Sequence, residues 1–368
     1  MRFIPRFVAL LFALCFAMLA YPEPAPVQPV GQVALQQRGQ LDESKLLDIG
    51  ITIFDDGIPS DISTHRELGI YPKVREVESR FMPVTLRQTL VASNAWGVVR
   101  VLPETSSLSE LWLEARILES SGLRLRLFIT ARDATGRVWL EREYLDESAE
   151  SDYPIAPGSE PFADLYRSIA NDLLTIRESL PETHLRDIRR IAFMRYAGSL
   201  SPEAFAGYLA EEAGQYSVQR LPAEGDDMIA RVERIRNQEY LFVDNVDEQY
   251  ITFQGQMAPA YDLWRQYDRE QAIYRVEYQQ RVANRDKQGR RGSFSAMQQT
   301  YNHYKVSKIQ QQDIRELALG FDNETAPTVL ETSGKVFRLT GTLDSQYHEW
   351  RGILRQIFAL ETGLPVEE

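Results

Sequence analysis

Cysteine and histidine are scarce in this sequence, and their scarcity excludes several chemistries. The 368 residues contain one cysteine, Cys15, and four histidines that are far apart along the chain. A mature chain without Cys15 forms no disulfide and has no thiol chemistry. No two histidines have the spacing of a helical zinc site. We therefore expect no metal site and no cofactor.

Local catalytic signatures and basic charge are also missing. GxSxG, SxxK and HExxH do not occur, and no GxGxxG follows an expected strand. The formal net charge is −12, whereas general nucleic-acid binding requires a basic surface. We therefore expect no nucleic-acid partner and assign no catalytic residue. Whether the chain is an enzyme stays open, and a non-enzyme is favoured.

The first twenty residues have the pattern of a secretory signal peptide. Arg2 and Arg6 precede the apolar run Phe7–Ala20, and the polar stretch YPEPAP follows. This run is short for a membrane span. Leu14 stands where a lipoprotein signal needs a small residue, so lipidation of Cys15 is not expected. The pattern predicts cleavage, a periplasmic or secreted protein, and no transmembrane span in the mature chain; an uncleaved anchor is the alternative.

Hydrophobic periodicity divides the rest of the chain into three parts. Residues 21–45 are rich in Pro, Gln and Gly, and are expected to form a flexible linker. Residues 46–181 are expected to form an α/β module, and residues 182–368 a mainly α-helical domain. The predicted fold class is therefore α+β.

The module is expected to be a sheet with two helices, in the order strand, helix, four strands, helix. Alternating apolar and β-branched residues predict the strands, and apolar residues three or four apart predict the helices. The predicted strands span 46–54, 96–103, 110–119, 123–131 and 137–144, and the predicted helices about 70–93 and 162–180. Matching the apolar faces of the last three strands places Leu113 opposite Ile129. It also places Trp112, Phe128 and Trp139 on the outer face, which predicts a partner-binding or interdomain surface.

Helical patterns dominate after residue 182. They predict helices at about 228–242, 258–286, 297–319 and 344–361, with a short strand at 335–341. Asp226 and Asp227 are expected to cap the first of these helices. Tyr261 and Trp264 belong to an aromatic stripe at helical spacing. The stripe is interpreted as packed core, with a carbohydrate- or peptide-binding face as the alternative.

Two charged clusters are further candidate sites. Asp55 and Asp56 follow the first predicted strand, where α/β sheets often place functional groups; a plain turn is the simpler interpretation, and a metal-binding or general-base role the alternative. The basic run that contains Arg285, Arg290 and Arg291 is expected to be a solvated loop. Docking of an acidic partner or a lipid headgroup is its alternative.

The stretches LDIGITIFDDG, RFMPVTLRQTL, WGVVRVLP and DATGRVWLEREY carry a resemblance in element order. Residues 46–181 resemble the α/β module of envelope proteins such as the curli secretion channel lipoprotein and the amino-terminal domain of TolB. The whole chain is similar to secreted envelope proteins of Gram-negative bacteria. The resemblance implies a non-catalytic role in assembling or bridging envelope complexes.

Three hypotheses about function follow. The first is a periplasmic accessory or scaffold protein that acts through envelope protein partners. The second is a cell-wall glycan-binding or glycan-modifying protein that uses Asp55, Asp56 and the aromatic helix. The third is a structural element that associates with copies of itself.

Overall fold

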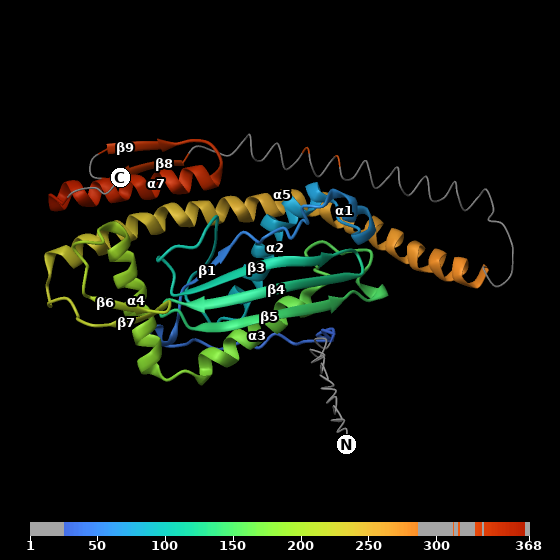
Figure 1. The fold of residues 1–368 in the computed structure, drawn as a ribbon, viewed down its shortest axis with the longest axis horizontal. Coiled ribbons are helices and arrows are strands. Elements are labelled where there is room, and N and C mark those ends of the chain that lie inside the picture. The colour runs from blue at the N-terminus through green and yellow to red at the C-terminus, as the bar shows by residue number, and fades with distance from the viewer. Residues whose placement is uncertain (1–25, 286–311, 313–315, 317–327, 333–334, 365–368) are drawn as a thin grey trace, which may run out of the picture.

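A five-stranded mixed sheet forms the centre of the computed structural model, which describes residues 26–285, 312, 316, 328–332 and 335–364 (Figure 1). The strand order is β2-β1-β3-β4-β5. β1 is parallel to β2 and β3, and the pairs β3–β4 and β4–β5 are antiparallel. The strands are β1 (Ile49–Thr52), β2 (Val99–Leu102), β3 (Leu111–Ser120), β4 (Arg124–Asp133) and β5 (Val138–Glu147). The predicted α+β class is confirmed.

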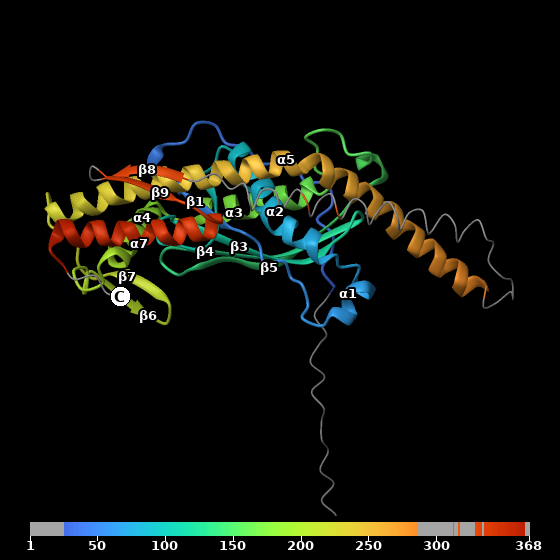
Figure 2. The same cartoon turned by 90° about the horizontal axis from the view of Figure 1, so that it is seen from above.

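Helices cover one face of this sheet. The crossover from β1 to β2 contains α1 (Ile62–Leu68) and α2 (Pro72–Ala92), and α3 (Ala163–Ser179) follows β5. α2 and α3 pack against each other on the same side of the sheet (Figure 2). α2 continues through Pro83, although proline lacks the backbone N–H of a helical hydrogen bond. Short 3-10 helices lie at η1 (Glu43–Lys45) and η2 (Glu150–Asp152).

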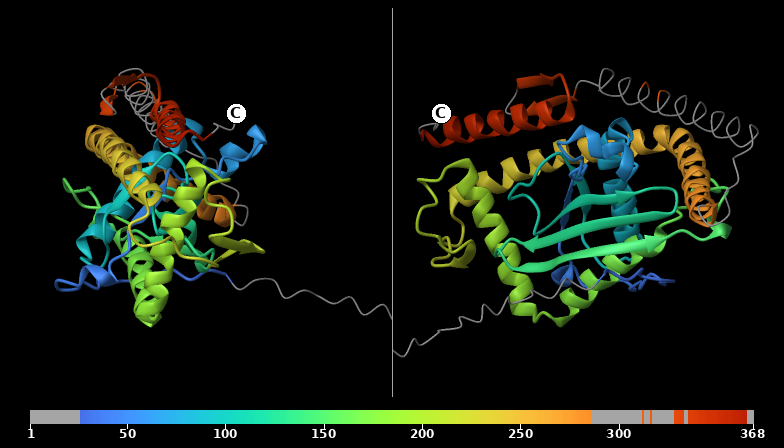
Figure 3. Two further views of the ribbon diagram at one scale, coloured as in Figure 1. Left: turned by 90° about the vertical axis from the view of Figure 1, so that its left-hand side faces the viewer. Right: turned by 45° about the vertical axis from the view of Figure 1, so that its right-hand side comes forward.

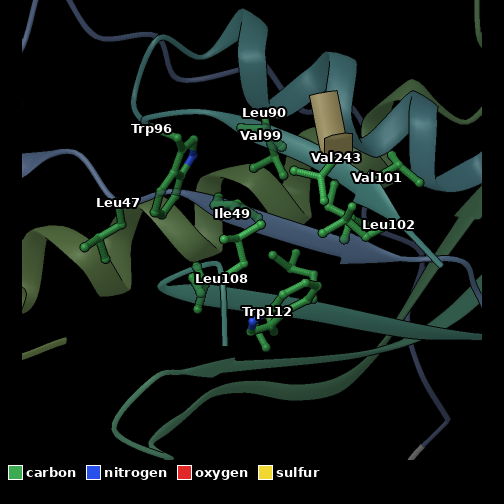
Figure 4. Close-up of a cluster of buried hydrophobic side chains, with 14 of the residues drawn as sticks. Leu47, Ile49, Leu90, Trp96, Val99, Val101, Leu102, Leu108, Trp112 and Val243 are labelled. Carbon is green, nitrogen blue, oxygen red and sulfur yellow. The ribbon is translucent and has the colours of Figure 1, made fainter. Parts of the chain in front are cut away.

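The helix-covered face of the sheet is the centre of the hydrophobic core. Ile49, Ile51, Val101 and Leu127 have no exposed surface. Burying one such side chain stabilises the fold by about 2 kcal/mol. Figure 4 shows Val243, from the second half of the chain, beside Val101 and Leu102 of β2. The same buried cluster continues as far as Phe358, so the core crosses the boundary expected after residue 181.

The second half contributes three helices and two hairpins to the described residues. The helices are α4 (Glu182–Leu200), α5 (Asp227–Arg285) and α7 (Leu343–Thr362). The hairpins are β6 (Leu209–Glu212) with β7 (Gln215–Val218), and β8 (Thr328–Thr332) with β9 (Lys335–Leu339). α7 lies along α5, with β8 and β9 beside it (Figure 3). The strand expected at 335–341 is therefore present as β9.

α5 is one helix of 59 residues, where two separate helices were predicted. Its apolar stripe does not stop in the middle, because Val246, Tyr250, Phe253 and Met257 are buried at helical spacing. Its start agrees with the prediction: the Asp226 carboxylate accepts a hydrogen bond from the N–H of Met228 at 2.9 Å.

The register of β3, β4 and β5 differs from the predicted one by two residues. Leu113 pairs with Ala131 instead of Ile129, and Trp112 pairs with Arg132. A shift of two residues keeps every side chain on its face, so apolar alternation cannot exclude it. The pairing also has irregularities at Ile117–Glu119 in β3 and opposite Ala131–Arg132 in β5.

Residues 26–45 are fixed against the body, where a flexible linker was predicted. Val30 donates its N–H to the carbonyl of Leu145 at 2.8 Å, and Arg38 forms an ion pair with Glu178 of α3 at 2.7 Å. Asn171 of α3 holds the same segment by two hydrogen bonds to its backbone. The composition of residues 26–45 is typical of a solvated chain. These hydrogen bonds and the ion pair nevertheless hold the segment against the body. Residues 1–25, with the predicted signal peptide, lie outside the described part.

Candidate functional site

Trp112, Phe128 and Trp139 do not form the outer aromatic row that the sequence predicted. Trp112 does lie on the outer face, but it packs over Gly50 of β1 and is only 8% exposed. A Cβ atom at Gly50 would lie 2.4 Å from Cζ3 of the Trp112 ring. Trp112 therefore fills a space that the missing side chain of Gly50 leaves open. Phe128 is half-buried, and it stands between Arg116 and Glu143.

Trp139 is turned away from the outer face by a bulge in β5. The register passes from Ala131–Leu140 to Arg132–Val138, so Trp139 is an extra residue in its strand. Its ring lies 6.3 Å from that of Trp96, and its Nε1 donates a hydrogen bond to Asp133 at 2.7 Å. Trp139 is therefore part of the buried core.

Paired charges occupy the rest of the outer face. Arg124 lies 3.3 Å from Glu147, and Arg126 lies 3.5 Å from Glu143. Glu119 lies within 4.0 Å of both arginines. Such partly exposed pairs contribute little to stability, each below about 1 kcal/mol. Phe128 is the half-buried aromatic residue among these pairs.

Asp55 and Asp56 form a turn at the carboxyl end of β1. Asp55 accepts the N–H of Gly57 at 2.9 Å, and Asp56 accepts the N–H of Ile58 at 3.0 Å. Asp55 also forms an ion pair with Arg116 at 3.1 Å. These contacts agree with the simpler interpretation of a turn, since one oxygen of each carboxylate is engaged by the local backbone.

The basic candidates fall largely outside the described residues. Arg285 is the last residue of α5, and its side chain is outside the described part. Arg290 and Arg291 lie in the segment 286–311, which is not described.

The structure also reveals charged contacts between α5 and the sheet that the sequence did not indicate. Asp247 of α5 accepts the N–H of Val101 at 2.7 Å, and its other oxygen lies 2.8 Å from Nε of Arg87 on α2. Arg100 of β2 forms an ion pair with Asp244 at 2.6 Å. Burial raises the pKa of Asp247, and the Val101 N–H and Arg87 oppose that effect. α5 therefore covers the β2 edge of the sheet.

A second attachment lies farther along α5. Tyr261 donates its hydroxyl hydrogen to Glu78 of α2 at 2.8 Å, and Ser120 of β3 donates to the same oxygen at 2.6 Å. Arg265 forms a buried ion pair with Glu160 at 2.6 Å and contacts the Tyr261 hydroxyl at 2.8 Å. Tyr261 and Trp264 of the aromatic stripe are buried, as the core interpretation predicted. Removing one partner of such a buried pair costs about 3–5 kcal/mol.

A third attachment joins α5 to the loop between β2 and β3. Arg236 donates to the carbonyl of Leu108 at 2.9 Å and lies 3.6 Å from the carboxylate of Glu110. Burial raises the pKa of Glu110 to about 7. Perturbed acids of this kind gather at functional sites, although structural ion pairs produce them as well.

Past these attachments, α5 continues beyond the sheet. The Asp268 carboxylate accepts the N–H of Gly122 at 2.9 Å, close to the turn between β3 and β4. The helix then runs on to Arg285, outside the outline of the sheet in two views (Figures 1 and 2). The first two thirds of α5 are thus fastened to the body, and its end projects.

Among the described residues, no group of three or more His, Cys, Asp or Glu side chains is arranged to hold a metal ion. None of the described helices combines the length and apolar character that crossing a membrane requires. A scan against models of protein families finds no match, and neither do searches among curated proteins and among solved structures.

Proposed function

We propose that this chain is a non-catalytic accessory or scaffold protein of the bacterial cell envelope, and that it acts by binding other proteins. The observation that carries the proposal is the form of α5, which is fastened to the body over most of its length and projects at its end. A helix held in this way presents its surface in one orientation. A partner that binds it therefore avoids the entropic cost of ordering a flexible segment.

The buried charges of the body support a scaffold over an enzyme. Asp247, Glu78 and Arg265 all join α5 to the sheet module. Each is engaged by backbone or side-chain groups of the same chain, so its role is to fix one packing arrangement.

Location in the periplasm, or secretion, is part of the proposal and is supported by the signal-like pattern of residues 1–20. The proposed partners are envelope proteins. The glycan-binding alternative loses support, because Asp55 and Asp56 hold a turn and Tyr261 and Trp264 are buried.

Site-specific photo-crosslinking in cells tests the proposal. A photoreactive amino acid is placed at single positions from 273 to 285, and as a control at Glu203, an exposed residue that is remote in sequence from α5. We expect one discrete protein adduct from a subset of the α5 positions and none from Glu203. An adduct of twice the chain mass would instead identify a second copy of the chain as the partner. The absence of any adduct at every α5 position, in cells with normal amounts of the protein, would contradict the proposal.

A further inference from the structure

β5 is the outer strand of the sheet at the edge opposite β2. Successive residues of an antiparallel strand point their backbone groups in opposite directions, toward and away from the neighbouring strand. The carbonyl of Leu145 accepts the N–H of Val30, which lies outside the sheet, at 2.8 Å. Ser148, after the strand, donates its N–H in the other direction, to the carbonyl that precedes β4, at 3.0 Å. The N–H and C=O groups of Glu141 and Glu143 therefore point away from β4.

The β5 edge is open at Glu141 and Glu143. Among the described residues, no hydrogen bond engages the outward N–H or C=O group of either residue. Glu141 and Arg142 are exposed, and Glu143 is half-buried. The β2 edge differs, because α5 covers it and Asp247 binds its backbone. An extended segment of another chain can therefore add to β5 as a further strand.

The side chains along the open edge select the charge of such a segment. Glu141 and Glu143 lie on the outer face of the sheet, opposite Thr130 and Phe128 of β4. Among the described residues, Glu141 has no ion-pair partner, and Glu143 has Arg126 at 3.5 Å. Opposite charges stabilise directly opposed residues of two strands, and like charges destabilise them. The edge therefore favours basic side chains at alternate positions of an added strand.

Arg142 determines which residues fit between these basic positions. Its side chain lies on the helix-covered side of β5, because neighbouring residues of a strand face opposite sides of the sheet. It forms an ion pair with Asp172 of α3 at 3.3 Å, and its guanidinium lies over the ring of Tyr144. A second cation beside Arg142 would be repelled. The segment that fits this edge thus alternates basic with uncharged residues.

A second copy of the chain does not fit the open edge. Two β5 strands that pair antiparallel there are related by a twofold axis at residue 141, 142 or 143. An axis at Glu141 or Glu143 places that glutamate opposite its own copy, and an axis at Arg142 places Glu141 opposite Glu143. Every arrangement brings like charges together, so the acidic edge disfavours self-pairing.

We propose that the open edge of β5 is a docking surface for an extended segment of a partner protein, with basic residues at alternate positions. The segment adds antiparallel to β5, as β4 does on the other side of the strand. Its backbone pairs with the outward N–H and C=O groups of Glu141 and Glu143, and its basic side chains lie beside the two carboxylates. This surface includes no residue of α5 and is independent of any partner that binds there.

Fluorescence anisotropy with labelled synthetic peptides tests the charge preference on the full chain. The probe is a short peptide in which lysine alternates with threonine, and the control peptide has glutamate in place of each lysine. We expect the lysine peptide to bind at least about ten-fold more tightly, because two favourable pairs replace two repulsive ones. Equal affinities, or no binding of either peptide, would overturn the proposal.

Methylation of the peptide backbone tests whether the peptide adds as a strand. In the antiparallel arrangement, a lysine opposite Glu141 or Glu143 directs its own N–H toward β5, whereas each threonine directs its N–H to solvent. N-methylation of the lysines should therefore weaken binding at least about ten-fold, and N-methylation of the threonines should weaken it much less. Equal effects of the two modifications would contradict strand addition and overturn the proposal.

Substitution of the two acids tests where the lysine peptide binds. The double variant Glu141→Gln with Glu143→Gln removes both charges and keeps the backbone, so it should weaken binding about five-fold. Glu114→Gln is the matched control and should leave the affinity unchanged: Glu114 is exposed and pairs with Thr130 as Glu141 does, but it lies on β3, away from the edge. An unchanged affinity in the folded double variant would place the peptide elsewhere and overturn the proposal.

Discussion

Asp247 of α5 accepts a hydrogen bond from the backbone N–H of Val101, and the two atoms lie 2.7 Å apart. β2 is an outer strand of the sheet, so this N–H has no strand to pair with. Exposed strand edges promote pairing with other chains, and proteins protect them with charges or covering elements. Here one carboxylate joins α5, the sheet edge and Arg87 of α2.

Asp247→Ala should destabilise the fold by about 3 kcal/mol, because it leaves a buried N–H and a half-buried arginine without their acceptor. Denaturant unfolding of the purified chain measures the loss. Glu248→Ala is the matched control on the same helix: the residue is exposed, so the change should cost below about 1 kcal/mol. Equal losses in the two variants would show that Asp247 has no special role at the edge.

Gly50→Ala should destabilise the fold by about 2 kcal/mol, since the new methyl group overlaps the Trp112 ring. Trp112→Leu makes room for that methyl group, so the double variant should lose at least about 1 kcal/mol less than the sum of the single variants. Gly255→Ala in α5 meets no atom within 4 Å and should be neutral or stabilising. Simple additivity of Gly50→Ala and Trp112→Leu would mean that the two residues do not share this space.

Trp139→Ala should cost about 3 kcal/mol or more in unfolding free energy, because it empties a core position and removes the hydrogen bond from Nε1 to Oδ2 of Asp133. Phe128→Ala, on the outer face, should lower the unfolding free energy by only about 1 kcal/mol, because a half-buried side chain removes less apolar area from water. Thermal and denaturant unfolding of both variants measure the difference. A larger loss of unfolding free energy in Phe128→Ala than in Trp139→Ala would contradict the placement of Trp139 in the core.

Trypsin should cut slowly after Arg38, because the Arg38 side chain is paired with Glu178 and the neighbouring backbone is held by Asn171. Asn171→Ala combined with Glu178→Ala should increase the cleavage rate at this bond without changing global stability by more than about 1 kcal/mol. Glu182→Ala, which removes the exposed ion pair to Lys45, is the control and should leave cleavage unchanged. Rapid cleavage after Arg38 in the parent chain would contradict this anchoring and support the flexible linker that the sequence predicted.

Local patterns in the sequence were sufficient to predict the element order of the sheet module. Each strand and helix has its own periodicity, and periodicity is readable within about ten residues. The continuity of α5 was also encoded, since Val246, Tyr250, Phe253 and Met257 keep helical spacing where a break was predicted. The sequence thus contained this signal, although two helices were expected.

The strand register and the buried charges could not be predicted in the same way. Trp139 appeared to lie on the outer face because the bulge that turns it inward has no marker in the sequence. Asp247 and Glu110 look like ordinary surface acids in sequence, and their environment comes from residues far away in the chain, such as Val101 for Asp247. Asp55 and Asp56 were predictable as a turn because their partners are two residues away.

Hydrogen exchange at the Val101 amide tests most directly whether α5 and the sheet form one folded unit. Ile49 is the reference, because its N–H donates to the carbonyl of Val98 in the buried β1 strand. We predict that the Val101 amide exchanges as slowly as the Ile49 amide, and that Asp247→Ala accelerates Val101 selectively. Rapid exchange at Val101 in the parent chain, with Ile49 still protected, would contradict this prediction.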